Sequence, residues 1–156
     1  MVIAIDMDGT IADLYAVPDW LPRLRAQDAT AYADAAPLVD AGELRYALAY
    51  ARATKGVQVE FVTWGSKGDT SPAFERATED AKRDWLNRNG FTYDALRYAP
   101  HGTPKSTLAS GPGVLIDDEG GNRSEWERSN MGRAFDPTDI CRRIIALADE
   151  VRASRP

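Results

Sequence analysis

Two short apolar runs of this sequence end in paired aspartates. The run at 2–7 leads into Asp6 and Asp8, and the run at 113–116 leads directly into Asp117 and Asp118. Four carboxylates gathered at one place repel one another unless a cation neutralises them. Because hard oxygen ligands favour Mg²⁺, we expect a magnesium site wherever the fold brings these four side chains together.

Residues able to hold a phosphate group lie farther along the chain. A second apolar run ends in Thr63, followed by Trp64 and Gly65, and a hydroxyl with glycine-flanked amides can bind phosphate oxygens. Lys105 can add a positive charge to the same crevice. Taken alone, Thr63 also fits an ordinary β-branched strand residue, and Lys105 fits a solvated surface lysine. Lys82 is a rival cation, but its helical register predicts an exposed face.

The elements that must position these residues follow from hydrophobic spacing and from Gly, Pro and capping residues. Strands are predicted at 2–7, 57–63 and 113–116, with weaker ones at 95–99 and 133–135. Helices are predicted at about 40–54, 72–90, 104–109 and 122–130, and from residue 138 or 139 onward. The alternation predicts one doubly wound, three-layer Rossmann-like α/β domain over residues 1–156, with a central parallel sheet. Sites in such domains lie beyond the carboxyl ends of the strands.

The helix predicted at 72–90 has a recognisable inward face. Its expected core contacts are Phe74, Ala77, Ala81, Trp85 and Leu86. Apolar residues at this spacing share one side of a helix, so this side should cover the sheet. By the same argument Trp126, on the helix after the second acidic pair, is expected in the core.

The same motifs resemble those of haloacid dehalogenase-type phosphatases. Asp6-Met7-Asp8-Gly9-Thr10 matches the family's DxDGT signature. Thr63 resembles the residue that ends the second motif, and Lys105 the lysine of the third. Leu115-Ile116-Asp117-Asp118 resembles the fourth motif, an apolar strand followed by paired acids. The four motifs occur in the family's order and span most of the chain.

The resemblance implies a phosphatase mechanism. Asp6 would attack phosphorus and form an aspartyl-phosphate, while Asp8 would serve as general acid and then base. Mg²⁺ would be held by Asp6, by the backbone carbonyl of Asp8, and by Asp117 or Asp118, between which the sequence does not choose. Thr63 and Lys105 would hold the phosphoryl oxygens. Gly9, Thr10, Trp64 and Gly65 are the remaining candidates for substrate contact in these motifs.

Substrate choice in this family often depends on a cap inserted after the first strand. Here residues 11–39 leave room only for a small helical cap. Within it, Trp20 could stack on a base or simply attach the cap to the body, and Arg23 could hold a second phosphate. The region around Asp118 is similar to that of 5′(3′)-deoxyribonucleotidases and of polynucleotide kinase phosphatase domains. We therefore expect a nucleotide-related monoester, with a polynucleotide end as the alternative.

Composition limits the remaining classes of function. A net charge of −5 argues against extended nonspecific nucleic-acid binding, although it allows a local phosphate pocket. The single cysteine excludes an intrachain disulfide, and no signal-peptide or membrane-helix pattern is present, so we expect a cytoplasmic protein. An open site could also be completed by a second subunit in a homodimer. A catalytically idle phosphate-binding module on the same fold is the competing hypothesis.

Overall fold

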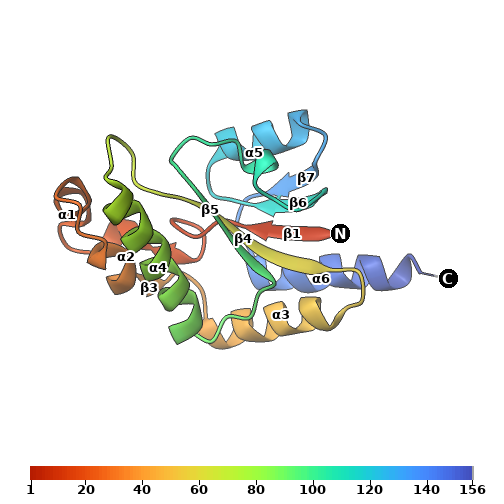
Figure 1. Ribbon diagram of the computed structural model, residues 1–156. Helices are drawn as coiled ribbons and strands as arrows, with labels where there is room; N and C mark the ends of the chain where they lie inside the picture. The colour runs from red at the N-terminus through yellow and green to blue at the C-terminus, as the bar shows by residue number, and fades with distance from the viewer. Residues whose placement is uncertain (156) are drawn as a thin grey trace.

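The computed structural model describes residues 1–155 and is built around a five-stranded parallel sheet (Figure 1). The strands are β1 (Val2–Ile5), β4 (Gln58–Trp64), β5 (Ala95–Ala99), β6 (Gly113–Ile116) and β7 (Gly132–Phe135). Their order across the sheet is β5-β4-β1-β6-β7. Since β1 lies between β4 and β6, the carboxyl ends of all three central strands meet at the same edge.

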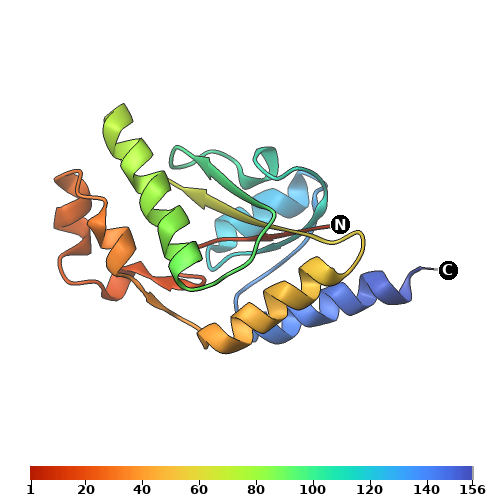
Figure 2. The same cartoon turned by 60° about the horizontal axis from the view of Figure 1, so that its bottom comes forward.

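Side chains of β1 alternate between two hydrophobic clusters, as the two-residue period of a strand requires. Ile3 and Ile5 belong to the large cluster covered by α3 (Ala41–Ala53) and α6 (Ile140–Ala153). Val2 and Ala4 face the opposite side, where Trp126 of α5 (Gly120–Arg128) is fully buried. Helices therefore cover both faces, and Figure 2 shows α3 and α6 running side by side on one of them.

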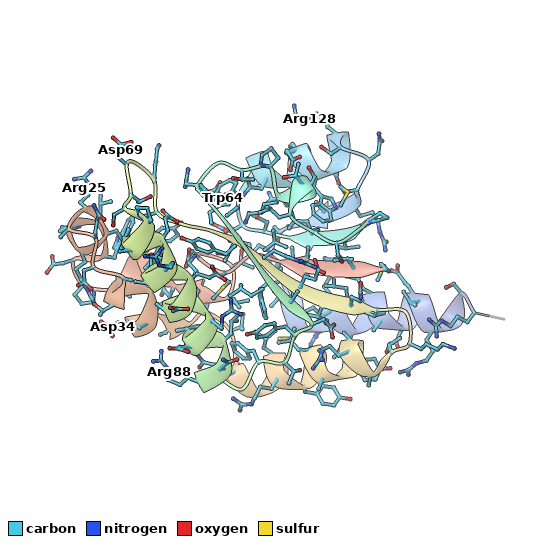
Figure 3. All side chains as sticks on the ribbon, in the orientation of Figure 1. Arg25, Asp34, Trp64, Asp69, Arg88 and Arg128 are labelled. Atoms are coloured by element: carbon cyan, nitrogen blue, oxygen red, sulfur yellow. The ribbon has the colours of Figure 1, made fainter. Side chains whose placement is uncertain are left out.

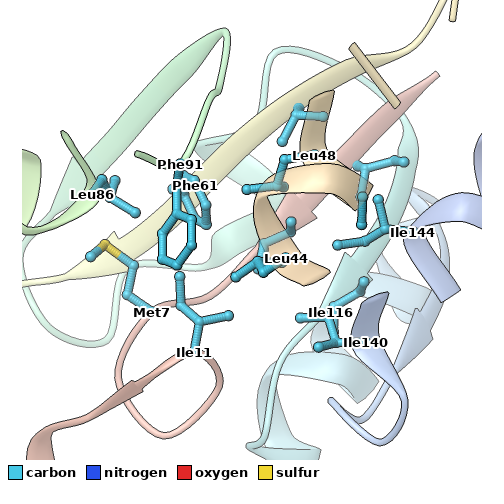
Figure 4. Close-up of a cluster of buried hydrophobic side chains, with 14 of the residues drawn as sticks. Met7, Ile11, Leu44, Leu48, Phe61, Leu86, Phe91, Ile116, Ile140 and Ile144 are labelled. Atoms are coloured by element: carbon cyan, nitrogen blue, oxygen red, sulfur yellow. The ribbon is translucent and has the colours of Figure 1, made fainter. Parts of the chain in front are cut away.

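The large cluster holds the sheet and its helices together (Figure 4). Leu44 and Leu48 of α3 meet Ile144 of α6 over Phe61 and Ile116 of the sheet, all five fully buried. Each such side chain contributes roughly 1.5 to 3 kcal/mol through removal of its surface from water. This packing makes the strand ends a rigid platform for polar residues.

The helix α4 (Pro72–Arg88) begins as the sequence predicts, with Ser71 accepting a hydrogen bond from the Phe74 amide and proline at the first turn. The predicted inward face is only partly correct. Thr78 and Lys82 are buried, whereas Ala77 is exposed and Ala81 is half-buried. Phe74, Trp85 and Leu86 are buried as predicted. Lys82 takes an inward position because its ammonium contacts Asp8 and Thr63 at the strand ends.

A small cap follows β1 and lies beyond the carboxyl ends of the strands (Figure 1). It consists of β2 (Ala12–Asp13), the 3₁₀ turn η1 (Leu14–Ala16), α1 (Trp20–Arg25), α2 (Thr30–Asp34) and β3 (Ala36–Pro37). The antiparallel pair β2 and β3 closes its base. The predicted helix at 104–109 is a single 3₁₀ turn, η2 (Lys105–Thr107). No helix within residues 1–155 combines the length and apolar character needed to cross a bilayer.

Candidate active site

The two acidic motifs lie side by side at the carboxyl edge of the sheet. Ile5 of β1 pairs with Ile116 of β6, and the Asp6 amide continues the ladder by donating to the Ile116 carbonyl at 2.9 Å. Asp6 and Asp117 therefore follow neighbouring strands at the same level. One carboxylate oxygen from each of Asp6, Asp117 and Asp118 lies within 4.8 Å of the other two. This spacing suits three ligands of one cation.

Lys105 lies between the two motifs. Its side chain is almost fully buried, and its ammonium group contacts Asp6 and lies 2.7 Å from Asp117. Its position on η2 follows from the connection between β5 and β6, which carries the lysine back over the strand ends. The structure thus brings Lys105 into the site expected from the sequence.

Asp117 and Asp118 have different environments. Asp117 is fully buried, and both of its oxygens accept hydrogen bonds, from Lys105, from the Glu119 amide and from Asn122 at 3.0 and 3.2 Å. Asp118 is partly exposed, and one of its oxygens accepts a hydrogen bond from Thr10 at 3.0 Å. Among residues 1–155 no hydrogen bond to the other Asp118 carboxylate oxygen is found. Asp118 therefore retains a carboxylate oxygen for a ligand.

Gly9 is required where the loop after β1 passes the second acidic motif. Its φ of +83° lies in the left-handed region, and an added Cβ would fall 2.6 Å from the Asp118 carboxylate. The Gly9 amide donates to the Ala12 carbonyl, and Thr10 supports Asp118 through its hydroxyl. These contacts give both residues a role in shaping the acidic cluster.

Burial and crowding of charge change the protonation of this cluster. Burial, reinforced by Asp117 and Asp8 and opposed by Lys105, raises the pKa of Asp6 from 3.8 to about 7. Burial likewise raises the pKa of Asp118, with a contribution from Asp117. Burial alone would lower the pKa of Lys105, but Asp6 and Asp117 outweigh it and raise that pKa. A divalent cation would relieve the repulsion that makes ionisation of Asp6 costly.

Lys82 is a residue of this site that the sequence reasoning placed elsewhere. Its predicted exposed face is wrong, because its side chain is only 1% exposed and its ammonium lies 2.5 Å from Asp8. The same group donates to the Thr63 hydroxyl at 2.8 Å and lies 4.6 Å from the ring centre of Tyr32, on the cap. Charged lysines are mostly exposed, so register on a polar helix gave no signal for this contact.

A pocket of about 410 Å³ opens from these residues toward the cap. The lining residues are Asp6, Asp8, Leu14, Tyr15, Trp20, Leu21, Leu24, Arg25, Tyr32, Trp64, Gly65, Ser66, Lys67, His101, Lys105, Glu119 and Asn122. Asp6, Asp8 and Lys105 thus share one cavity with aromatic side chains of the cap and of the body. Thr63 is fully buried and is linked to Asp8 through Lys82, which donates to both side chains.

Two candidate substrate contacts have other partners. The Gly65 amide, expected to face phosphate, donates to the Ala99 carbonyl at 2.8 Å and extends the sheet. Arg23, expected to hold a second phosphate, instead forms ion pairs with Asp28 and Asp34 inside the cap. Arg23 is not among the pocket-lining residues within 1–155. The sequence could not reveal these acids as its partners, because they approach only once the cap folds.

Comparisons with known proteins agree with this architecture. No protein-family model and no curated protein matches the chain. Among solved structures, a chain of the Pnkp1/Rnl/Hen1 RNA repair complex is similar over 86% of this chain and 41% of its own length, with a TM-score of 0.57 and 16% identity. A chain in a second structure of the Pnkp1/Rnl/Hen1 complex is similar over 86% of this chain and 44% of its own length. The TM-score of that match is 0.55 and the identity is 16%.

A third similar structure is the HAD domain of the effector protein Lem4 from Legionella pneumophila. It covers 96% of both chains with a TM-score of 0.43 and 11% identity. The present chain spans about two-fifths of the length of the first two matches. The sheet order, the helices on both faces and the small cap confirm the doubly wound α/β fold that the haloacid dehalogenase-type motifs predict, and the two matches with TM-scores of 0.57 and 0.55 share it.

Proposed function

We propose that this chain is a magnesium-dependent phosphohydrolase that cleaves a phosphate monoester through an aspartyl-phosphate. The observation that carries the proposal is the convergence of Asp6, Asp117 and Asp118 within 4.8 Å beside the buried ammonium of Lys105. Three carboxylates suit a hard divalent cation, and a cation with a lysine suits an anionic phosphoryl group. Asp8 lines the same pocket and supplies the proton-transfer group that an alkoxide leaving group needs.

The proposed reaction has two steps. The Asp6 carboxylate forms a bond to phosphorus as the bond to the leaving oxygen breaks, and that oxygen takes a proton from the Asp8 carboxylic acid. A water oxygen then attacks the aspartyl-phosphate and gives a proton to Asp8, which releases inorganic phosphate and regenerates Asp6. Lys105 faces the position where negative charge develops on the phosphoryl group.

The acidic residues fit Mg²⁺, and their contacts favour one assignment. Asp6 and Asp118 would hold the ion with the backbone carbonyl of Asp8, because Asp118 retains a carboxylate oxygen while both oxygens of Asp117 are engaged. Asp117 would instead orient Lys105. When bound, the ion would screen Asp6 from the anionic substrate and stabilise the transferring phosphoryl group.

The finer substrate assignment is a nucleotide or a related phosphate. Aromatic side chains around the pocket suit a nucleobase, and one similar structure belongs to an RNA repair complex. A phosphatase acting on polynucleotide ends is the second candidate, and the small cap favours it.

The test is hydrolysis of p-nitrophenyl phosphate by the wild-type chain with Mg²⁺ and with EDTA. We expect turnover only with the metal, and none in Asp6→Asn. The exposed Asp84→Asn, on the outer face of α4, is the matched control and should behave as wild type. Acid-quenched mass spectrometry should detect a phosphoryl adduct on Asp6. Absence of turnover across mononucleotides, oligonucleotides and sugar phosphates would support the idle phosphate-binding module instead.

A further inference from the structure

The outer part of the pocket presents aromatic side chains from both the cap and the body. On the cap, Tyr15 and Trp20 contact edge to face with ring centres 5.2 Å apart. On the body, Trp64 and His101 lie 4.9 Å apart. The Trp64 ring is fixed, because its indole nitrogen donates to the Thr103 carbonyl at 2.8 Å. Two aromatic surfaces therefore line one cavity.

Part of this apolar surface remains exposed to solvent. Tyr15 is 51% exposed and Leu21 is 38% exposed, and both line the pocket. Exposed apolar surface gathered at a concave site is typical of ligand binding. The chemistry beside Asp6 concerns only a phosphoryl group, so the apolar surface must serve the group that leaves.

Two cations, Arg25 on α1 and Lys67 on the loop after β4, line the same pocket. Within residues 1–155 neither side chain makes an ion pair or a side-chain hydrogen bond, unlike Arg23, which has two acidic partners. Figure 3 shows Arg25 at the outer end of the cap. Two unpaired cations at the pocket of a protein with net charge −5 indicate a second anionic group on the ligand.

The cap holds these residues in place before any ligand binds. The Tyr32 hydroxyl lies 2.7 Å from that of Ser66, the Trp85 indole donates to the Ala35 carbonyl at 2.7 Å, and Gln27 accepts hydrogen bonds from Ser71. Tyr32 and Trp85 are both buried. Three residue pairs thus fasten the cap to α4 and to the loop before it, so the aromatic side chains of cap and body face each other across a preorganised pocket.

We propose that the outer pocket is a subsite for the terminal nucleoside of a phosphorylated oligonucleotide. Its base lies between the aromatic pair Tyr15 and Trp20 and the pair Trp64 and His101, and its next phosphodiester is held by Arg25 and Lys67. The inference rests on the proposed phosphohydrolase function, because Asp6 defines where the terminal monoester lies. It deepens that function by selecting a nucleic-acid end over a free mononucleotide.

Size, shape and charge agree with this ligand. A volume of about 410 Å³ lies at the small end of the roughly 300 to 1,000 Å³ typical of ligand pockets, which suits one nucleotide and leaves the rest of the strand outside. Base stacking on aromatic rings tolerates any base. A mononucleotide fills the aromatic part but leaves Arg25 and Lys67 without an anion, whereas a dinucleotide engages both parts.

The first experiment measures kcat/KM for matched substrates. The set comprises a dinucleotide with a terminal monoester, placed at the 3′ or the 5′ end, the same molecule with a neutral methylphosphonate linkage, the mononucleotide, and p-nitrophenyl phosphate. We expect kcat/KM for the better dinucleotide to exceed that for its methylphosphonate form and for the mononucleotide by about tenfold or more. Hydrogen bonds to a charged group contribute a free energy of this size. Raising NaCl from about 50 to 200 mM should shrink that advantage.

Variants identify the residues responsible. The double variant Arg25→Gln/Lys67→Gln should lower the ratio of dinucleotide to p-nitrophenyl phosphate kcat/KM by about tenfold or more. Tyr15→Ala should lower kcat/KM for both nucleotide substrates by about tenfold, because the base loses a stacking surface. Lys55→Gln is the charge-matched control, because Lys55 is exposed and lies before β4, at the opposite end of the strand from the site. Equal kcat/KM for dinucleotide and methylphosphonate would overturn the proposal.

A binding measurement separates failure of the subsite from failure of the catalytic proposal. Calorimetry with Asp6→Asn and the phosphorylated dinucleotide needs no turnover. Tighter binding of the dinucleotide than of its methylphosphonate form, lost in the Arg25→Gln/Lys67→Gln background, supports the subsite even if no ester is hydrolysed. Hydrolysis of small esters with no such difference in binding would retain the phosphohydrolase and reject the subsite.

Discussion

The ammonium of Lys82 lies 2.5 Å from the carboxylate of Asp8 and 2.8 Å from the hydroxyl of Thr63. It joins the ends of β1 and β4 through a side chain that α4 carries into the core. A buried lysine is costly unless it is paired, so this contact fixes the position of Asp8. The ring of Tyr32 covers the ammonium and links the cap to the same pair.

Lys82→Met should therefore impair proton transfer more than phosphoryl binding. We expect kcat for an alkyl phosphate to fall by roughly two orders of magnitude, because a misplaced Asp8 cannot protonate an alkoxide. Loss on 2,4-dinitrophenyl phosphate should be much smaller, since its leaving group needs no proton. Steady-state kinetics on both esters measures the difference, with Lys55→Met as control and circular dichroism to verify folding. Equal losses on the two esters would mean that Lys82 acts on the phosphoryl group.

Asp8→Asn tests the acid and base role directly. Turnover of an alkyl phosphate should fall by roughly two to four orders of magnitude, while Mg²⁺ binding is largely retained because the backbone carbonyl remains. Kinetics and calorimetric Mg²⁺ titration provide the two readouts. A variant with a near-normal rate would remove Asp8 from the mechanism.

Asp6→Asn should stabilise the metal-free protein at high pH. Burial raises the pKa of Asp6 to about 7 in the folded chain from 3.8, so the unfolded chain ionises first as the pH rises. The free energy of unfolding therefore falls between about pH 4 and pH 7, and a neutral asparagine removes that loss. We expect Tm to rise by on the order of 5 °C at pH 8 and much less at pH 4.

The same melting experiment reports on the metal. Mg²⁺ should raise the Tm of the wild type at pH 8 by binding the folded state, and raise that of Asp6→Asn far less. Asp84→Asn should follow the wild type throughout. An Asp6→Asn variant whose Tm tracks the wild type at both pH values would contradict the burial argument.

Asp117 and Asp118 should have different roles, one in stability and the other in metal binding. Asp118→Asn should weaken Mg²⁺ binding by about tenfold or more, because it removes the carboxylate with an unengaged oxygen. Asp117→Asn should weaken it less and instead lower the free energy of unfolding by about 1 to 3 kcal/mol, since Lys105 loses one of its two charged partners. Calorimetry and denaturant unfolding measure the two effects. The reverse pattern would exchange the roles of these residues.

The sequence alone determined the strands that end in acids and the type of fold. Apolar runs before Asp6 and Asp117 required buried strands, and parallel strands place their carboxyl ends at one edge. The five predicted strands and the burial of Trp85 and Trp126 are confirmed, because hydrophobic periodicity is a local signal.

Only the tertiary structure decided which polar side chains meet. The neighbours of Lys82 along the helix predicted a solvated side chain. Its burial depends on Asp8, which lies 74 residues away in the sequence. The sequence predicted a free cation at Arg23, but the folded cap brings Asp28 and Asp34 to it. Arg25 forms no ion pair among residues 1–155. Ion pairs between residues distant in the sequence form only when the chain packs, so the helical period of α4 could not place Lys82 beside Asp8.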